Sequence, residues 1–526
     1  MSTVPETNGK PEVHPYIVSF TVVLAMFMEL LDSTVVNVSM PHIAGNLSAT
    51  IEEATWVLTS YLVANAIVLP LAGWFSSLFG RKRFYMICVT IFTFASLMCG
   101  LSTSLGSLVF FRIMQGAGGG AMQPLAQAIT VESFPRKKLG MAMSIFSMGV
   151  VLAPIIGPTL GGWITDDYNW HWIFLINIPV GAVALILTSI FVHDPPFLVR
   201  RSLRDGMKID YIGLGLIALG LGFLQFTLDK GQLEDWFSSN LIVASLIVAL
   251  VAIAGAIIWE LRHPDPIVDL RLLKNRNFGL ATVTMLLVGF VLYGSTLILP
   301  LMLQSLLGYT ALLSGLVLSP GGFVVLLMAP VVGWLTQKVE VRWLLAFGVS
   351  IFAISLFHMA HFNLNIDYNT AMTSRMFQSL GMAFLFIPIN VSAFYYIAQK
   401  DVNRATGLIN LARNIGGSVG IAMVATMLSR RQQFHQSVLV SHLNPLNQVY
   451  QSSLAGATQM LAAKGADPVQ AAAQAQGIFY GMAQRHAAML AFADIFWIMG
   501  IAFLLIIPLA FLMKKGMGHK SAVAAH

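Results

Sequence analysis

The chain has 526 residues, of which 57% are hydrophobic and only 10% are charged, whereas an average soluble domain has about 25% charged residues. This composition excludes a soluble globular protein. The net charge of +7 would suit nucleic-acid binding, but most Lys and Arg residues lie in short connections between apolar segments, where they set membrane orientation, so nucleic acid is not an expected partner.

Apolar runs of about 20 residues, the length that crosses a hydrocarbon core of about 30 Å, recur along the chain. The basic connections place both termini in the cytoplasm, and the first 15 residues lack the features of a cleaved signal peptide. The sequence therefore predicts an all-α integral membrane protein with fourteen spanning helices. We expect them near residues 16–40, 55–79, 84–103, 107–131, 139–165, 172–192, 211–228, 240–260, 279–303, 312–337, 342–360, 370–397, 405–428 and 487–513.

Two short motifs occur twice, which predicts an internal repeat. The sequence Pro-x-x-Gly-Trp begins at Pro70 and again at Pro330, and Arg-x-x-Gln begins at Arg112 and again at Arg375. The copies lie 260 and 263 residues apart, a distance that holds about eight spans and connections. Each half then contains six helices, with two more inserted between them, and parallel six-helix repeats are typical of the major facilitator fold.

The repeat divides the chain into segments. We predict a cytoplasmic tail at 1–15, a six-helix bundle at 16–192, a cytoplasmic linker at 193–210, two inserted helices at 211–260, a second cytoplasmic linker at 261–278, a six-helix bundle at 279–513 and a cytoplasmic tail at 514–526.

The segment 430–486 of the second bundle is too polar to span the membrane and should lie in the periplasm. Helix starts at Asn444-Pro445 and Asp467-Pro468, with a stop at Gly465, predict two short helices there. The segment is either a solvated cap or a docking surface for a periplasmic partner.

The first predicted helix carries two acidic residues, Glu29 and Asp32, in an apolar setting. Their spacing of three places both on one helix face. An ionisable residue within a span is costly and indicates function. Burial disfavours the charged form of a carboxyl group, and a second carboxylate disfavours it further, which suits proton binding and release. The alternative is that one of the two only caps or pairs with a basic group.

The fourth predicted helix carries a polar stripe of Arg112, Gln115, Gln123 and Gln127 beside a run of glycines. A permanently charged Arg in a span needs an anion, and the first-helix carboxylates are the natural candidates. We therefore assign proton coupling to Asp32, Glu29 and Arg112.

Polar and aromatic residues elsewhere in the spans are candidates for substrate binding, because a few polar groups in an apolar, adaptable pocket suit varied ligands. Structural packing is the alternative for each of them. The candidates are Tyr61, Asn65, Gln115, Gln123, Tyr293, Arg375, Asn390, Arg413 and Asn414.

Five motifs resemble those of the fourteen-helix drug:proton antiporters of the major facilitator superfamily, and the similarity covers essentially the whole chain. They lie at 31–41, 108–116, 149–162, 172–181 and 266–278. In that family the first-helix acid, here Asp32, is implicated in proton coupling. The loop after the second helix departs from the pattern. It has Ser77 and Leu78 where the family usually has an acidic and a basic residue, so the sequence lacks two residues of the superfamily's cytoplasmic charge latch.

The motif at 149–162 is similar to a fifth-helix signature associated with antiporters rather than symporters. Its glycines permit close helix contact and its prolines bend the helix, which suits a hinge between the halves. A purely structural kink is the alternative. The motif residues are Gly149, Pro154, Gly157, Pro158, Gly161 and Gly162.

These features together predict an exporter of hydrophobic drug-like compounds in the bacterial inner membrane, driven by proton antiport. The resemblance also implies a periplasmic membrane-fusion adaptor and an outer-membrane channel as partners. A dedicated exporter of one metabolite, such as a fatty acid, siderophore or antibiotic intermediate, is the alternative. We find no metal-ligand cluster, nucleotide loop or nucleophile elbow in the sequence, so neither an enzyme nor a cofactor is expected, and the buried carboxylates argue against a passive channel.

Overall fold

A computed structural model of the chain describes residues 13–195, 210–264, 266–444 and 446–514, and within these residues all regular structure is helical. The predicted tails therefore lie almost entirely outside the described residues, as does most of the first linker. The long helices are α1 (Pro15–Asn46), α3 (Trp56–Val68), α5 (Arg81–Gly100), α6 (Leu105–Gly119), α7 (Met122–Ser133), α8 (Leu139–Asp167), α10 (Asn177–Phe191), α11 (Tyr211–Lys230), α12 (Asn240–Arg262), α13 (Arg276–Leu307), α14 (Ala311–Leu335), α15 (Val341–Met359), α16 (Tyr368–Tyr395), α17 (Val402–Ser441), α18 (Gln448–Ala463) and α19 (Pro468–Leu504).

Thirteen helical segments of the described residues are long and apolar enough to cross a membrane. They overlap thirteen of the fourteen predicted spans. One of them joins α3, a short 3₁₀ turn and α4 (Ala72–Phe79), and another joins α19 and α20 (Ile506–Leu512). The chain is a multi-pass membrane protein.

The remaining predicted span, 107–131, forms two consecutive helices rather than one. Helix α6 ends at Gly119 and α7 begins at Met122. Pro124 explains the break, because proline has no N–H to continue the helical ladder and its ring crowds the preceding turn.

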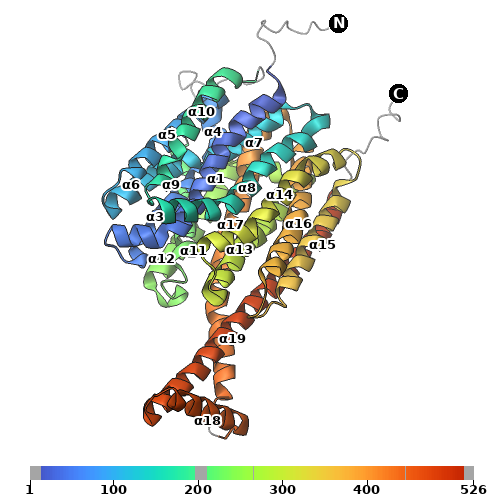
Figure 1. Ribbon diagram of the computed structural model, residues 1–526. Helices are drawn as coiled ribbons and strands as arrows, with labels where there is room; N and C mark the ends of the chain where they lie inside the picture. The colour runs from blue at the N-terminus through green and yellow to red at the C-terminus, as the bar shows by residue number, and fades with distance from the viewer. Residues whose placement is uncertain (1–12, 196–209, 265, 445, 515–526) are drawn as a thin grey trace, which may run out of the picture.

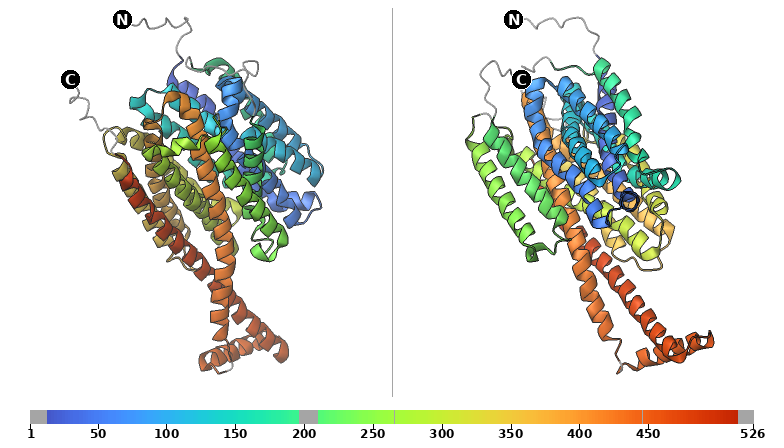
Figure 2. Two further views of the ribbon diagram at one scale, coloured as in Figure 1. Left: turned by 180° about the vertical axis from the view of Figure 1, so that it is seen from behind. Right: turned by 90° about the vertical axis from the view of Figure 1, so that its left-hand side faces the viewer.

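The helices before α11 and those after α12 form two groups that pack against each other mainly through α8 and α14. Helices α11 and α12 pair and sit at the edge of the molecule, where α11 contacts α3 and α17 (Figures 1 and 2). The first turn of α1 and the end of α20 lie at one end of the molecule, and α18 projects from the other (Figure 1).

The prediction of two separate short helices within 430–486 is wrong. Among the described residues of this segment, only α18 is a separate short helix, while α17 runs on to Ser441 and α19 starts at Pro468, so both extend far beyond the helical body (Figure 1). No Gly or Pro interrupts the chain between Arg430 and Ser441, and extending an existing helix needs no new nucleation. The predicted stop at Gly465, which has a φ of +95°, and the start at Pro468 are confirmed. Pro445 lies outside the described residues.

Candidate functional site

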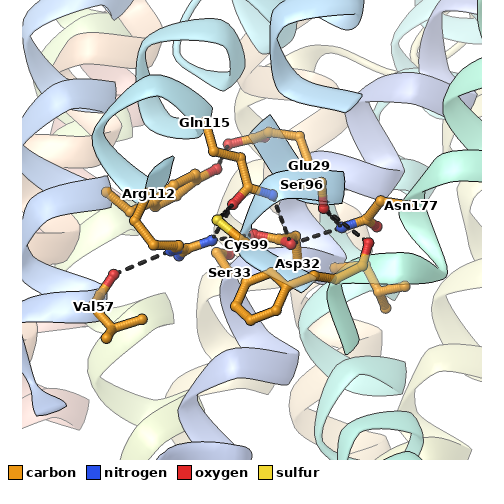
Figure 3. Close-up of polar contacts among 12 residues, drawn as sticks. Glu29, Asp32, Ser33, Val57, Ser96, Cys99, Arg112, Gln115 and Asn177 are labelled. Atoms are coloured by element: carbon orange, nitrogen blue, oxygen red, sulfur yellow. Dashed lines mark hydrogen bonds and ion pairs between the residues drawn. The ribbon is translucent and has the colours of Figure 1, made fainter. Parts of the chain in front are cut away.

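The carboxylate of Asp32 lies at the centre of a buried polar network in the first half of the chain (Figure 3). It accepts hydrogen bonds from Arg112 Nη1 at 2.6 Å, Gln115 Nε2 at 3.0 Å and Asn177 Nδ2 at 2.7 Å. The Asn177 amide also donates to Ser96 Oγ at 2.9 Å. The side chains of Asp32 and Arg112 have no exposed surface. Helices α1, α5, α6 and α10 therefore meet at one neutralised, fully buried ion pair.

The guanidinium of Arg112 is fixed by further contacts. Its Nε donates to the carbonyl oxygen of Val57 at 3.1 Å, and Nη1 also donates to Gln115 Oε1 at 2.8 Å. The guanidinium carbon lies 4.1 Å from the centre of the Tyr61 ring, a distance typical of a cation–π contact. Its Nη2 is buried without a hydrogen-bond partner among the described residues. Arg112 is thus held toward Asp32 while keeping one unused donor.

Glu29, one turn before Asp32 on α1, occupies a different environment. Its Oε1 accepts hydrogen bonds from Tyr61 Oη at 2.8 Å and Asn65 Nδ2 at 3.0 Å. Its Oε2 is buried and has no partner within the described part of the chain. The first helix therefore carries one carboxylate paired with Arg112 and another that has an unused oxygen.

Glycines at the end of α6 and directly after it bring these groups together. A Cβ added at Gly116 would overlap the carbonyl oxygen of Tyr61, and one added at Gly120 would overlap that of Asn65. Small residues at such positions let two helix backbones approach closely. The close approach of α3 is what places Tyr61 and Asn65 beside Glu29.

Three glycines of the motif at 149–162 face α1. A Cβ at Gly149 would meet α1 side chains at 2.7 Å, one at Gly161 would meet Val35 at 3.0 Å, and one at Gly157 would overlap Thr34. Pro154 and Pro158 lie inside α8, and Gly162 is buried. The other side of α8 packs on α14 of the second half, so this helix connects the acidic helix to the boundary between the halves.

The second half carries two buried arginines that, unlike Arg112, form no salt bridge with a carboxylate of the described residues. Arg375 on α16 donates from Nη1 to Gln378 Oε1 at 2.5 Å, and no described carboxylate forms an ion pair with it. Arg413 on α17 interacts with Tyr293 and lies close enough to Glu29 for their charges to interact. Next to it, Asn414 is half-buried.

Buried amides join the two halves. Gln127 Nε2 on α7 donates to Asn390 Oδ1 on α16 at 2.7 Å, and Gln127 Oε1 accepts from Asn410 Nδ2 on α17 at 2.5 Å. Gln123, one turn away, is buried with Nε2 unpartnered in the described chain. The stripe predicted on the fourth helix is therefore divided: Arg112 and Gln115 serve the first-half network, while Gln127 reaches the second half.

At the end of the molecule opposite α18, charged and polar contacts form without the two missing latch residues. Arg81 pairs with Glu132 at 2.7 Å, and both side chains are buried. Asn403 on α17 donates to Ser76 Oγ and to the carbonyl oxygen of Gly73. Arg81 is the first residue of α5, and its side chain is packed inside the protein. The latch region therefore still joins the halves.

Sequence reasoning missed the contributions of Asn177, Ser96 and Glu132 to these networks. Asn177 stands in a motif at 172–181, but nothing in its helical spacing shows that its amide reaches Asp32. Ser96 is one of many small polar residues in apolar spans. A single amide in an otherwise apolar helix is the signal that could have identified Asn177, because such a group needs a partner when it is buried.

Comparisons with known proteins agree with the fold and the motifs. The sequence profile of the Major Facilitator Superfamily matches residues 22–421. The chain is 34% identical over 508 residues to the multidrug export protein EmrB of Escherichia coli strain K12, covering 95% of this chain and 96% of that protein.

It is also 35% identical over 499 residues to the fatty acid resistance protein FarB of Neisseria gonorrhoeae, covering 94% and 96% of the two chains. Among solved structures, the proton:xylose symporter XylE superposes with a TM-score of 0.60 at 14% identity, over 96% of this chain and 97% of that one, which shows the fold alone. The chain therefore belongs to the Major Facilitator Superfamily, among the relatives of the multidrug export protein EmrB.

Proposed function

We propose that the chain exports hydrophobic compounds across the bacterial inner membrane in exchange for protons, with fourteen spanning helices and both termini in the cytoplasm. The similarity to EmrB over nearly the whole chain supports multidrug efflux. The observation that carries the proton part is the buried Asp32–Arg112 pair with Glu29 one turn away.

Proton binding in this proposal uses the difference between the two carboxylates. Asp32 is fully engaged by three donors, including Arg112, whereas Glu29 Oε2 has no partner in the described chain and can carry a proton without breaking a hydrogen bond. A proton reaching Asp32 would release Arg112, because a neutral carboxyl group holds a guanidinium far less strongly. In this proposal Glu29 is therefore the site where the proton first binds, and the Asp32–Arg112 ion pair rearranges when the helices move.

Movement of the halves would convert proton binding into transport. Helix α8 contacts α1 through the glycines at Gly149, Gly157 and Gly161 and contacts α14 on its other side. A change at Asp32 on α1 can thus reach the boundary between the halves through direct packing. One charge moved down 100 mV supplies about 2.3 kcal/mol, which corresponds to roughly 50-fold in concentration.

Substrate would contact both halves near the middle of the spans. The proposed contacts from the first half include Tyr61, Asn65 and Gln123, and those from the second half include Tyr293 and Arg413. Arg375, Asn390 and Asn414 are further candidates on α16 and α17. Most of these side chains are buried in the present arrangement, so the proposal requires the halves to separate on one side.

The hairpin of α17, α18 and α19 is the proposed contact for a periplasmic membrane-fusion adaptor, which would lead to an outer-membrane channel. Its support is the length by which both helices project from the body (Figure 2). A dedicated exporter of fatty acids is the second candidate function, because FarB is named for fatty acid resistance and matches the chain over nearly its full length.

The test is proton movement in proteoliposomes on adding a panel of lipophilic cations, weak-acid uncouplers and fatty acids. We expect several unrelated compounds to drive proton movement in the wild type, and Asp32→Asn and Glu29→Gln to abolish it. Asp166→Asn is the matched control, since its side chain is 57% exposed at the end of α8. Coupling that survives in both variants would contradict the proton assignment, and a response to fatty acids alone would favour the second function.

A further inference from the structure

The second half repeats the arginine–glutamine arrangement of the first half without its acid. In α6, Arg112 Nη1 donates to Gln115 Oε1 at 2.8 Å, and both side chains also donate to Asp32. In α16, Arg375 Nη1 donates to Gln378 Oε1 at 2.5 Å in the same way. Both arginines are buried, with 0% and 2% of their surface exposed. One arrangement holds a carboxylate, and the other has none among the described residues.

The missing acid can be traced to α13, which occupies the place in the second half that α1 has in the first. The repeat offsets of 260 and 263 residues put Leu292 and Ser295 at the position of Asp32, and α13 contains no Asp or Glu between Arg276 and Leu307. The Ser295 hydroxyl donates to the carbonyl oxygen of Leu292 within its own helix. Helix α13 therefore offers no side-chain anion to Arg375.

Three polar groups on one face of α16 are buried without partners among the described residues. They are Arg375 Nε, Gln378 Nε2 and Ser379 Oγ, and positions three and four apart on a helix share a face. In the first half the equivalent amide, Gln115 Nε2, binds Asp32. A buried cation and buried donors without partners are costly in an apolar interior, and an anion placed against this face would satisfy them.

Helix α14 closes over this face through a glycine. A Cβ added at Gly321 would overlap Ser379 Oγ and lie 3.5 Å from Arg375 Cγ. Val317 lies one turn before Gly321 on α14 and Met382 one turn after Ser379 on α16, and both are buried and apolar. An anion bound here would keep its charged group between α14 and α16 and could place an apolar body among these helices.

We propose that Arg375 and Gln378 bind the carboxylate of a hydrophobic substrate, with Ser379 as a third donor, in the way that Arg112 and Gln115 bind Asp32. This assignment rests on the proposed export function and names its substrate class: amphipathic molecules with a carboxylate at one end. Arginine with a neighbouring amide suits a planar carboxylate because its N–H groups form a fixed fork. The first half shows the arrangement with a carboxylate in place.

Binding of a matched ligand pair tests the site directly. The full chain in lipid nanodiscs is titrated at pH 7 with 2-naphthoate, which is anionic, and with 2-naphthamide, its neutral analogue. The wild type should bind naphthoate more tightly, and Arg375→Gln should weaken naphthoate binding by about 10- to 100-fold, the range for lost hydrogen bonds to a charged group, while changing naphthamide binding less than about twofold. Gln378→Leu should weaken naphthoate less, since it removes a neutral donor.

A stability measurement separates this role from a structural one. Without ligand, Arg375→Gln should unfold at the same temperature as the wild type or higher, because it removes an unpaired buried cation. Arg112→Gln should unfold at a lower temperature, because it leaves Asp32 buried without its counter-ion. If Arg375→Gln destabilises the protein as much as Arg112→Gln does, Arg375 is a structural residue and the assignment is overturned.

The outcomes also separate this inference from export itself. Equal naphthoate affinity in the wild type and in Arg375→Gln overturns the carboxylate site even if proteoliposomes transport lipophilic cations. Naphthoate binding that depends on Arg375, in a protein that moves no compound in proteoliposomes, supports the site and contradicts the exporter. Competition by millimolar chloride equal to that by naphthoate would show a site for any small anion and would overturn the carboxylate class.

Discussion

Replacing Asp32 by asparagine should destabilise the folded protein more than any other single substitution in the first-half polar network. The change keeps the size of the side chain but removes its negative charge, leaving Arg112 as a buried cation without a counter-ion. The new amide also has only one acceptor oxygen for the three donors that now converge on the carboxylate, from Arg112, Gln115 and Asn177.

The expected loss in the free energy of unfolding follows from the burial of the Asp32–Arg112 ion pair. Removing one partner of a buried ion pair typically costs about 3–5 kcal/mol, which is a large part of a total stability of about 5–15 kcal/mol. Adding Arg112→Gln removes the remaining charge, so the double variant should be more stable than Asp32→Asn alone. The coupling free energy between the two sites should be about 1–3 kcal/mol, the range for residues in direct contact.

The assay is equilibrium unfolding in mixed detergent micelles, followed by tryptophan fluorescence, for the wild type, both single variants and the double variant. Asp166→Asn serves as a matched control, because that carboxylate is exposed, and should change the free energy of unfolding by less than about 0.5 kcal/mol. A loss below about 1 kcal/mol for Asp32→Asn, with no recovery in the double variant, would refute the reasoning. It would mean that the folded protein does not hold Asp32 and Arg112 as a charged pair.

Three further predictions concern other parts of the chain. Gly157→Ala would place a methyl group where a threonine side chain of α1 lies, so it should lower both transport and the unfolding temperature. The control Gly456→Ala, at a glycine with open space around it, should change neither. Asn390→Leu leaves the Gln127 amide without its acceptor and should cost about 1–3 kcal/mol in detergent unfolding; a change below about 0.3 kcal/mol would mean that the amide finds another partner. A hydrogen bond from a threonine hydroxyl holds the pKa of the exposed Asp367 carboxyl below its usual value. This carboxylate therefore stabilises the fold fully above the unfolded-state pKa of about 4, and the stabilisation is lost as the pH falls through the folded-state pKa. Asp367→Ala should therefore lower the unfolding temperature at pH 7, and a difference that did not shrink below about pH 4 would contradict this cause.

Part of the candidate site could be predicted from local sequence. Glu29 and Asp32 share a helix face because of their spacing, and an Arg on another span had to find an anion, which it finds in Asp32. The repeated Arg-x-x-Gln motif also gave two comparable positions, Arg112 and Arg375. Arg112 is paired with an acid and Arg375 is not, because α13 carries no acidic residue. The lack of acids in α13 is visible in the sequence, but the position of α13 beside α16 is known only from the structure.

The sequence by itself determined where thirteen of the spans lie, because a run of about 20 apolar residues is a local property that lipid requires. Tertiary structure decided which polar groups meet. Asn177 reaches Asp32 only because α10 packs on α1 and α5, and Gln127 reaches Asn390 only because the two halves close on each other. Such contacts join residues 145 and 263 positions apart. Helical periodicity relates residues only a few positions apart. It therefore predicts the direction in which a side chain leaves its helix, whereas the packing of the helices decides which other side chain it meets.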